Sequence, residues 1–243
     1  MAMDTTSGNG GYGRAANFHS LLNGLTAFSI SMWIFSRVIN TDKGMCIATT
    51  PAGGDNDFSF RYDTSGANGG GDGVIKFGIV TTGNGDERQL ESTSFAQVQD
   101  TWQHVAICGV NDGTNLALYI DGEFDAPTAV ENWAGTITGC DNWFVGRGGK
   151  DTGSATWDGL ISDMKVFNRA LGAEEVKTIF TLRGRDGIVD GLLGCWRLND
   201  QPIGTIMGTG DFVDTSNNKN NLDGTNSPEI VAGETAFRRR RSA

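Results

Sequence analysis

Short runs of residues with a strongly apolar side chain at every second position dominate this chain and most constrain its fold. In residues 28–35 this alternation has the period of a β-strand that buries one face. Runs of the same kind occupy residues 57–62, 74–81, 103–110, 115–120, 142–147 and 159–167. The dipeptide Asp121-Gly122 directly follows one run and predicts a two-residue hairpin turn, because both central residues of such a turn need positive φ. The chain is therefore expected to consist mainly of antiparallel strands joined by tight turns.

One segment predicts a helix. Val176, Ile179 and Phe180 are spaced i, i+3 and i+4, and two glutamates precede them in the first turn, where the helix dipole favours negative charge. We expect one short helix near residues 172–181. Since strands and helices do not alternate, the α/β folds that bind nucleotides are excluded. The predicted fold class is all-β, a two-sheet antiparallel sandwich, and 243 residues suit one such domain.

The overall charge argues against a nucleic-acid partner. The chain has 19 basic and 29 acidic residues and a net charge of −10, whereas surfaces that bind nucleic acid gather lysine and arginine. A run of arginines near the C-terminus is the local exception: Arg238, Arg239, Arg240 and Arg241. We interpret this run as an arm that contacts acidic groups of a neighbouring protein subunit; the alternative is a solvated tail. No stretch approaches eighteen consecutive apolar residues, so no membrane partner is expected.

The cysteines and the N-terminal segment both bear on the compartment. The cysteines, whose spacings match no zinc pattern, are Cys46, Cys108, Cys140 and Cys195. Because Cys108 and Cys195 have apolar neighbours, buried free thiols are favoured over disulfides. Residues 1–20 lack the basic start and apolar stretch of a secretory signal, so we expect the chain to stay in the cytosol or to leave by another route. A signal that had been removed would leave the same sequence.

Three segments between residues 100 and 180 resemble a known family. The first reads WQHVA at residues 102–106 and LYIDG at 118–122, the second reads FVG at 144–146, and the third reads WDGLISDMKVFNRAL at 157–171 followed by EEV at 174–176. They are similar to motifs of the LamG-like jelly rolls of the concanavalin A-like group, in which the third has the form FxGxIDDVRIYNRALSxEEI. The resemblance implies a jelly-roll sandwich that is built to bind rather than to catalyse.

A fourth similar segment is out of order. WRLND at residues 196–200 and DTSNNKN at 214–220 resemble the family's opening motif, yet here they follow the predicted helix. We interpret the chain as circularly permuted: one domain over residues 1–243, in which residues 190–236 complete the sandwich and residues 237–243 form a basic tail. Termini of compact domains often lie close together, which makes permutation easy. Permutation predicts that WRLND pairs within the sheets and buries its tryptophan; the alternative is the opening of a second, truncated domain.

The sequence predicts no catalytic residues. Glucanases of this group carry ExDxxE on one strand, which projects the carboxylates into one cleft. The nearest fragment here, Glu123-Phe124-Asp125, lacks the second glutamate and is soon followed by Pro127. The resemblance gives His104 a structural position on a strand, and no nucleophile accompanies it in the sequence. We therefore expect that the chain is not an enzyme.

Calcium and glycans are the ligands for which the sequence offers candidates. Oxygen-rich turns that suit calcium occur at residues 53–57, 141–142 and 150–153, but tight turns select the same residues, so calcium stays open and no ligand is assigned. Trp133 lies in a loop-like segment and is the candidate for stacking on a glycan, because its ring presents a flat face with a polar handle. The alternative for such tryptophans is the sandwich core, which the resemblance implies for Trp157.

Two functions compete. The first is a non-enzymatic structural or interaction protein, specifically a virion decoration or capsid-attached head-fibre subunit whose partners are other protein subunits. It reconciles a fold typical of exported proteins with the missing signal and reduced thiols, since a phage protein is made in the host cytosol and released by lysis. The second is a carbohydrate-binding module of a secreted or cell-surface protein. The expected location is the virion or, for the second function, the extracellular space.

Overall fold

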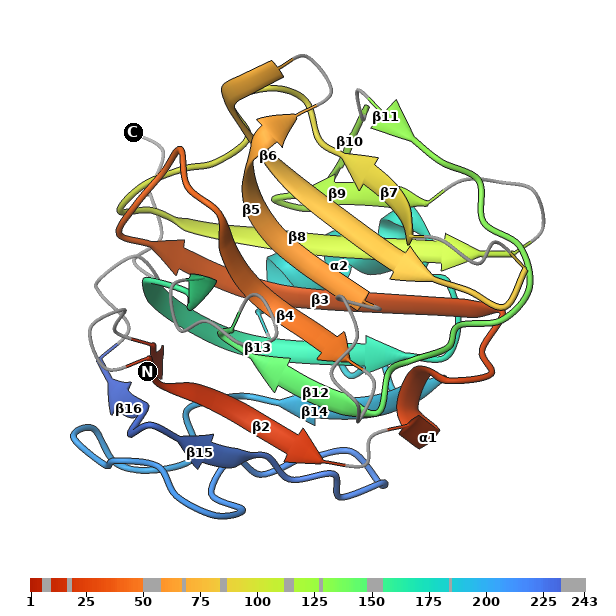
Figure 1. The fold of residues 1–243 in the computed structure, drawn as a ribbon. Coiled ribbons are helices and arrows are strands. Elements are labelled where there is room, and N and C mark those ends of the chain that lie inside the picture. The colour runs from red at the N-terminus through yellow and green to blue at the C-terminus, as the bar shows by residue number, and fades with distance from the viewer. Residues whose placement is uncertain are drawn as a thin grey trace.

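Two eight-stranded antiparallel sheets, packed face to face, make up the fold, and a helix lies over the outer face of one sheet (Figure 1). The computed structural model describes residues 1–5, 10–16, 19–49, 58–66, 69–83, 87–111, 116–126, 129–147, 155–183 and 185–232. The arrangement confirms the predicted all-β class and the two-sheet sandwich. Among these residues there is no helix with the length and apolar character needed to cross a membrane.

The two sheets are named here by their position relative to the helix. Sheet A, next to the helix, has the order β10 (Glu123–Asp125), β9 (Ala117–Ile120), β8 (Trp102–Val110), β3 (Ala27–Ser36), β13 (Gly159–Phe167), β1 (Ala2–Asp4) and β16 (Glu229–Val231), and β14 (Leu192–Trp196) also pairs with β13. Sheet B, the opposite layer, has the order β11 (Ala129–Val130), β7 (Glu87–Glu91), β6 (Gly69–Val80), β5 (Phe58–Gly66), β4 (Lys43–Thr49), β12 (Asn142–Val145), β2 (Tyr12–Ala16) and β15 (Asp223–Thr225).

Strand β3 lies in the middle of sheet A, and its side chains point alternately to the two faces of the sheet. Ile30 and Met32 belong to the core between the sheets, whereas Trp33 and Phe35 belong to a separate cluster on the opposite face. Both faces are buried, since the helix α2 (Ala173–Leu182) covers the outer one. β3 therefore has a partner layer on each side.

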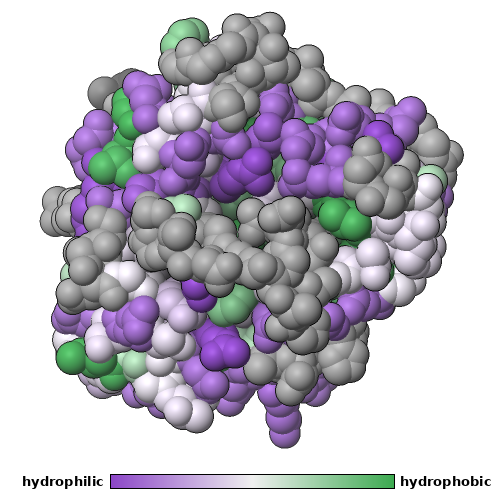
Figure 2. All heavy atoms as spheres, in the orientation of Figure 1, coloured by the Kyte–Doolittle hydropathy of each residue, from purple (hydrophilic) through white to green (hydrophobic). Residues whose placement is uncertain are grey.

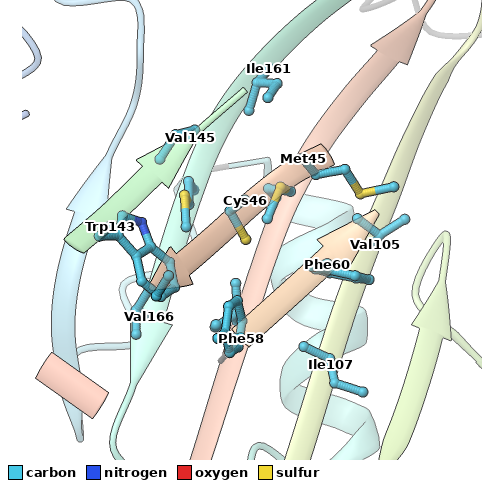
Figure 3. Close-up of a cluster of buried hydrophobic side chains, with 14 of the residues drawn as sticks. Met45, Cys46, Phe58, Phe60, Val105, Ile107, Trp143, Val145, Ile161 and Val166 are labelled. Carbon is cyan, nitrogen blue, oxygen red and sulfur yellow. The ribbon is translucent and has the colours of Figure 1, made fainter. Parts of the chain in front are cut away.

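The core between the sheets consists of large apolar side chains from both layers. Figure 3 shows part of it: β5 contributes Phe58 and Phe60, β12 contributes Trp143, and Ile107 and Val166 come from sheet A. Fully burying a side chain of this kind stabilises a fold by roughly 1.5–3 kcal/mol. All four cysteines are free and buried, as the sequence predicts.

The predicted hairpin turn and helix are both present. Ile120 and Glu123 pair across a two-residue turn in which Asp121 has φ 51° and Gly122 has φ 79°. Helix α2 begins and ends within one residue of the predicted range. A second helix, the four-residue α1 (His19–Leu22), is not predicted from the sequence, because a single turn is too short to show a period.

Both ends of α2 are fixed by specific contacts. The Gly172 N–H donates to the Glu175 carboxylate at 3.0 Å, and Arg169 pairs with the same carboxylate at 2.6 Å, which holds the pKa of Glu175 at about 2. At the other end Arg183 has φ 47°, and its N–H donates to the Ile179 carbonyl at 3.0 Å. This left-handed residue ends the helix.

The C-terminal segment contributes strands to both sheets. β14 pairs antiparallel with β13, with Trp196 opposite Met164. Trp196 is fully buried, and its indole N–H donates to the Asn220 carbonyl at 2.8 Å. β15 joins sheet B beside β2, and β16 joins sheet A beside β1. Permutation predicts that WRLND pairs within the sheets and buries its tryptophan, and Trp196 shows both features; that residues 1–243 form one domain stays a prediction.

Asp214 organises the loop that follows β14. Its buried carboxylate accepts four hydrogen bonds of 2.8 Å, from the N–H groups of Cys195, Ser216 and Asn220 and from the Ser216 hydroxyl. The aspartate of the DTSNNKN motif therefore closes a turn onto β14. Its hydrogen-bonding capacity is used by the chain itself.

Candidate functional site

A pocket of about 350 Å³ opens on the outer face of sheet A, beside the C-terminal end of α2. This volume lies within the range of small-ligand sites. The walls come from the residue before β1, from β3 and β13, from the end of α2 and from the segment after β14. The described lining residues are Met1, Trp33, Ser162, Asp163, Arg183, Arg185, Arg197 and Asn199. We call this site the arginine pocket.

A β-bulge in β13 places two consecutive side chains in the arginine pocket. The pairing of β13 with β3 shifts register between Ser162 and Lys165, and Asp163 has φ 48°. In a regular strand Asp163 would face the core if Ser162 faced outward. With the bulge, Ser162 and Asp163 both line the pocket, and Met164 belongs to the core. Bulges re-aim side chains in this way beside functional sites.

The Asp163 carboxylate has unmet hydrogen-bonding capacity. Within the described residues neither of its oxygens accepts a hydrogen bond, although the side chain is only 11% exposed. Lys165 Nζ lies 3.8 Å from Oδ2 and also pairs with the buried carboxylate of Asp186. Burial raises the pKa of Asp163, while Lys165 opposes that rise. Because a buried acceptor without a donor is costly, this carboxylate suits a ligand that brings its own donors.

Three arginines line the same pocket as this carboxylate. The guanidinium of Arg183 lies 4.9 Å from the centre of the Trp33 ring, a cation–π contact. The Arg197 carbonyl accepts from the Ser162 hydroxyl and from the Asp163 N–H, each at 3.2 Å, so its backbone is fixed while its side chain is exposed. The side chain of Arg185 is exposed as well. Among its described residues the pocket thus combines three positively charged donors with one carboxylate.

The arginine pocket can bind a ligand but offers little for hydrolysis. Asp163 is the one carboxylate among its described lining residues, whereas glycoside hydrolysis uses a pair. The Ser162 hydroxyl donates to the Arg197 carbonyl and so joins two walls of the pocket. Guanidinium groups, an amide and a carboxylate are instead a set of hydrogen-bonding groups for recognition.

The outer face of sheet B carries a second polar surface, which lies toward the viewer in Figures 1 and 2. Arg61 donates to Asp63 at 2.8 Å and to Ser59 at 2.5 Å, and Lys76 pairs with Glu91 at 2.9 Å. These side chains satisfy one another across β5, β6 and β7. This surface therefore leaves less unmet hydrogen-bonding capacity for a ligand than the arginine pocket does.

Trp133, the residue predicted to stack on a glycan, belongs to the core. Its side chain is 3% exposed and packs edge-to-face on Phe28, with ring centres 6.0 Å apart. In this position it offers no open ring face to a sugar, which corrects the prediction. The segment around it is irregular but tied down, since the Thr81 hydroxyl donates to the Ala134 carbonyl at 2.6 Å. Trp157 is buried in the core, as the resemblance implies.

The predicted docking arm and most of the calcium candidates lie outside the described residues. This holds for Arg238, Arg239, Arg240 and Arg241 and for residues 53–57 and 150–153. At the third calcium candidate, the Asp141 carboxylate accepts from the Asn23 amide at 3.1 Å. The part of the chain that the structure describes contains no group of three or more metal-ligating side chains. The docking arm and calcium binding stay predictions.

The residues weighed for catalysis have structural contacts. Glu123 pairs with Lys177 of α2 at 2.8 Å, and Asp125 accepts from the Thr93 N–H and hydroxyl at 2.9 Å each. His104 is fully buried, with its ring 5.3 Å from that of Trp33. None of the three lines the arginine pocket.

Sequence reasoning did not assign any residue of the arginine pocket. A partial signal was present, because Arg183 and Arg185 directly follow the predicted helix and Arg197 lies within the displaced motif. Nothing in their spacing connects them to Asp163. A bulge and the permuted strand order bring these residues together, and neither can be read from a periodic pattern.

Comparison with known proteins finds similarities of family and fold. A family model described as "Concanavalin A-like lectin/glucanases superfamily" matches residues 7–177. A heptameric SAP-like pentraxin from Limulus polyphemus is similar at 17% identity and a TM-score of 0.51, over 75% of this chain and 82% of the pentraxin chain. Two structures of the Ruminococcus gnavus IT-sialidase CBM40 are also similar at 17% identity. The one bound to α2,3 sialyllactose has a TM-score of 0.52 and the one bound to α2,6 sialyllactose 0.51, each over 70% of this chain and 93% of theirs. A search of curated proteins gives no match.

Proposed function

The chain belongs to the concanavalin A-like lectin/glucanases superfamily, and from that membership we propose that it is a non-catalytic module that binds a glycan in the arginine pocket. The observation that carries the proposal is Asp163, which lines a cavity of ligand size and whose two carboxylate oxygens accept no hydrogen bond within the described residues. Two structures of similar fold are bound to sialyllactose, which supports a sugar as the ligand. Such a module would act in the extracellular space.

Sugar hydroxyls match the groups that line the pocket. Each hydroxyl donates one hydrogen bond and accepts others, so a sugar can donate to Asp163 while accepting from Asn199 and the arginines. Hydrogen bonds to a carboxylate are stronger than those between neutral groups. The bulge at Asp163 holds this acceptor at the wall of the pocket before a ligand arrives.

Asp163→Asn tests the proposal. Asparagine tolerates the positive φ of this position, so the backbone is kept while the charge and one acceptor oxygen are lost. We expect glycan affinity, measured by calorimetry after a glycan-array screen, to fall about tenfold or more, since a hydrogen bond to a charged group contributes roughly 1.5–3 kcal/mol.

Asp100→Asn is the matched control. Asp100 is exposed, has φ 53° and does not line the arginine pocket, so the same chemical change should leave affinity unchanged. The proposal is wrong if the protein binds no glycan, or if Asp163→Asn binds as tightly as the unmodified chain.

The role as a virion decoration or capsid-attached subunit stays a prediction of the sequence. The arginine run at residues 238–241 is the docking arm predicted for this role, and exposed ion pairs of such a tail contribute only when several form at once. The chain lacking residues 238–243 should fold normally and lose salt-sensitive sedimentation with viral particles. Equal sedimentation of both chains would leave the run a solvated tail.

A further inference from the structure

We infer that the arginine pocket selects a glycan that bears an acidic group, which Arg185 and Arg197 hold while sugar hydroxyls donate to Asp163. The inference rests on the proposed function and adds the class of sugar. Three guanidinium groups line the pocket. The negative charges of Asp163, which also lines the pocket, and of Asp186 are offset in part by Lys165. The pocket therefore carries an excess of positive charge on a chain whose net charge is −10.

Two of these arginines keep their hydrogen-bonding capacity for a ligand. Within the described residues the side chains of Arg185 and Arg197 form no ion pair or hydrogen bond. Arginines elsewhere are used by the fold: Arg37 binds both oxygens of Asp4 at 2.9 and 2.7 Å, and Arg169 binds both oxygens of Glu175. The guanidinium group is a planar fork that matches a carboxylate or a sulfate with two parallel hydrogen bonds.

The backbone beneath the arginines is fixed in advance. Arg197 lies between the buried side chains of Trp196 and Leu198, and Leu198 has φ 57°. Asp163 and Arg183, which also line the pocket, have positive φ as well. Left-handed residues other than glycine are strained and gather at functional sites, because the surrounding fold must hold them in place. The β-bulge fixes Asp163, the end of α2 fixes Arg183, and two buried neighbours fix Arg197, so the backbone around the pocket is held without a ligand.

Arg183 adds a lid-like wall to the pocket. Its guanidinium lies over the Trp33 ring, so the charge of this exposed side chain is held at the pocket. An acidic group that enters the pocket would meet Arg197 and Arg185 with Arg183 beside them, and the hydroxyl side of the sugar would face Asp163. A neutral sugar would leave the guanidinium groups of Arg185 and Arg197 without a negatively charged partner.

The test compares sugars that differ only in charge. Calorimetry at low salt would use a neutral oligosaccharide, the same oligosaccharide with a carboxylate, the same with a sulfate, and sodium sulfate alone. We expect the acidic forms to bind about tenfold or more tightly than the neutral form, and to lose this advantage as salt is raised, because the arginines are exposed. The ratio of carboxylate to sulfate affinity identifies which acid the pocket prefers.

Arg197→Gln should lower affinity for the acidic sugar about tenfold and affinity for the neutral one by a clearly smaller factor, because glutamine keeps a hydrogen-bond donor but loses the charge. Arg14→Gln, which removes an exposed arginine from sheet B, is the matched control and should change neither. Melting temperatures of both variants check that the fold is intact.

The outcomes separate this inference from the proposed function. Equal affinity for neutral and acidic sugars, with no effect of Arg197→Gln, overturns the inference and leaves glycan binding in place. Binding of sulfate alone, weakened by Arg197→Gln but with no sugar bound, supports the anion site and contradicts the proposed glycan. Binding of none of the probes overturns both.

Discussion

His104 is a buried imidazole that folding keeps neutral. Its ring packs against Trp33 and Phe180, and neither ring nitrogen has a hydrogen-bond partner among the described residues. Burial, with help from the charge of Lys165, lowers the pKa of His104 from 6.5 to about 3. Below pH 6.5 the unfolded chain therefore binds a proton that the folded chain does not, and stability must fall as the pH drops from 6.5 toward 3.

We predict that His104 alone lowers the free energy of unfolding by about 2 kcal/mol between pH 7 and pH 5. His104→Phe keeps an aromatic ring in the cluster and removes the titration, so its stability should depend less on pH by this amount. Urea unfolding of both proteins at pH 5, 6 and 7 measures the difference. Parallel pH profiles for the two proteins would show that His104 is not held neutral.

Single residues also mark where sequence reasoning reaches its limit. The hairpin turn could be predicted because Asp121 and Gly122 are adjacent and their requirement for positive φ is local. The burial of Trp133 could not, because an irregular segment can be fixed by contacts such as the bridge between Thr81 and Ile137. The position of Asp163 in the pocket could not be predicted either, because the direction of its side chain depends on a β-bulge against β3.

At the scale of elements, Gly122 couples the β9–β10 hairpin to α2. An added Cβ at Gly122 would lie 2.8 Å from Phe180 Cδ1 and 3.0 Å from its Cβ, in addition to the strain of φ 79°. Gly24 has φ 83° but nothing within 4 Å of the added atom, so Gly24→Ala measures the cost of the backbone strain alone. We predict that Gly122→Ala destabilises the fold by about 1 kcal/mol more than Gly24→Ala, since α2 must shift to make room. Chemical denaturation measures both losses, and equal losses would mean that hairpin and helix are not coupled.

The elements that the sequence predicts are those with a clear period. β3, β8 and β13 alternate strongly, and α2 shows helical spacing. β4 was not predicted, because four of its seven residues are the small Gly44, Cys46, Ala48 and Thr49, so it lacks a run of strongly apolar side chains. β11 and β15 have two and three residues, too few to show a pattern. The residues of the arginine pocket come from several strands and from the end of α2. The pocket could therefore not be predicted from any one element, because it depends on how the elements are arranged.

At the scale of the whole molecule, we propose that residues 1–243 form one domain that residues 190–236 complete. The structure motivates this proposal through β14, β15 and β16, which place the end of the chain in both sheets. Deleting residues 190–243 would remove the fully buried Trp196 from the core and expose an edge of sheet B at β2. We predict that the shortened chain aggregates and shows no cooperative melting, because an uncovered strand edge pairs with other copies. A soluble shortened chain with a sharp melting transition would favour a separate, truncated second domain.

Reversing the permutation tests the same proposal without removing any part of the sandwich. β16 pairs antiparallel with β1, with Val231 opposite Ala2, so a short linker can join residue 232 to residue 1 as a hairpin. The new ends would lie between Val189, which is 73% exposed, and Asp190, in the connection between α2 and β14. A chain that runs from residue 190 to 232 and then from 1 to 189 should therefore melt cooperatively near the temperature of the original chain, because every strand keeps its neighbours. Calorimetric melting of both chains measures this. If the rearranged chain fails to fold while the original does, chain order and not only strand pairing is required, and the permuted single-domain interpretation is wrong.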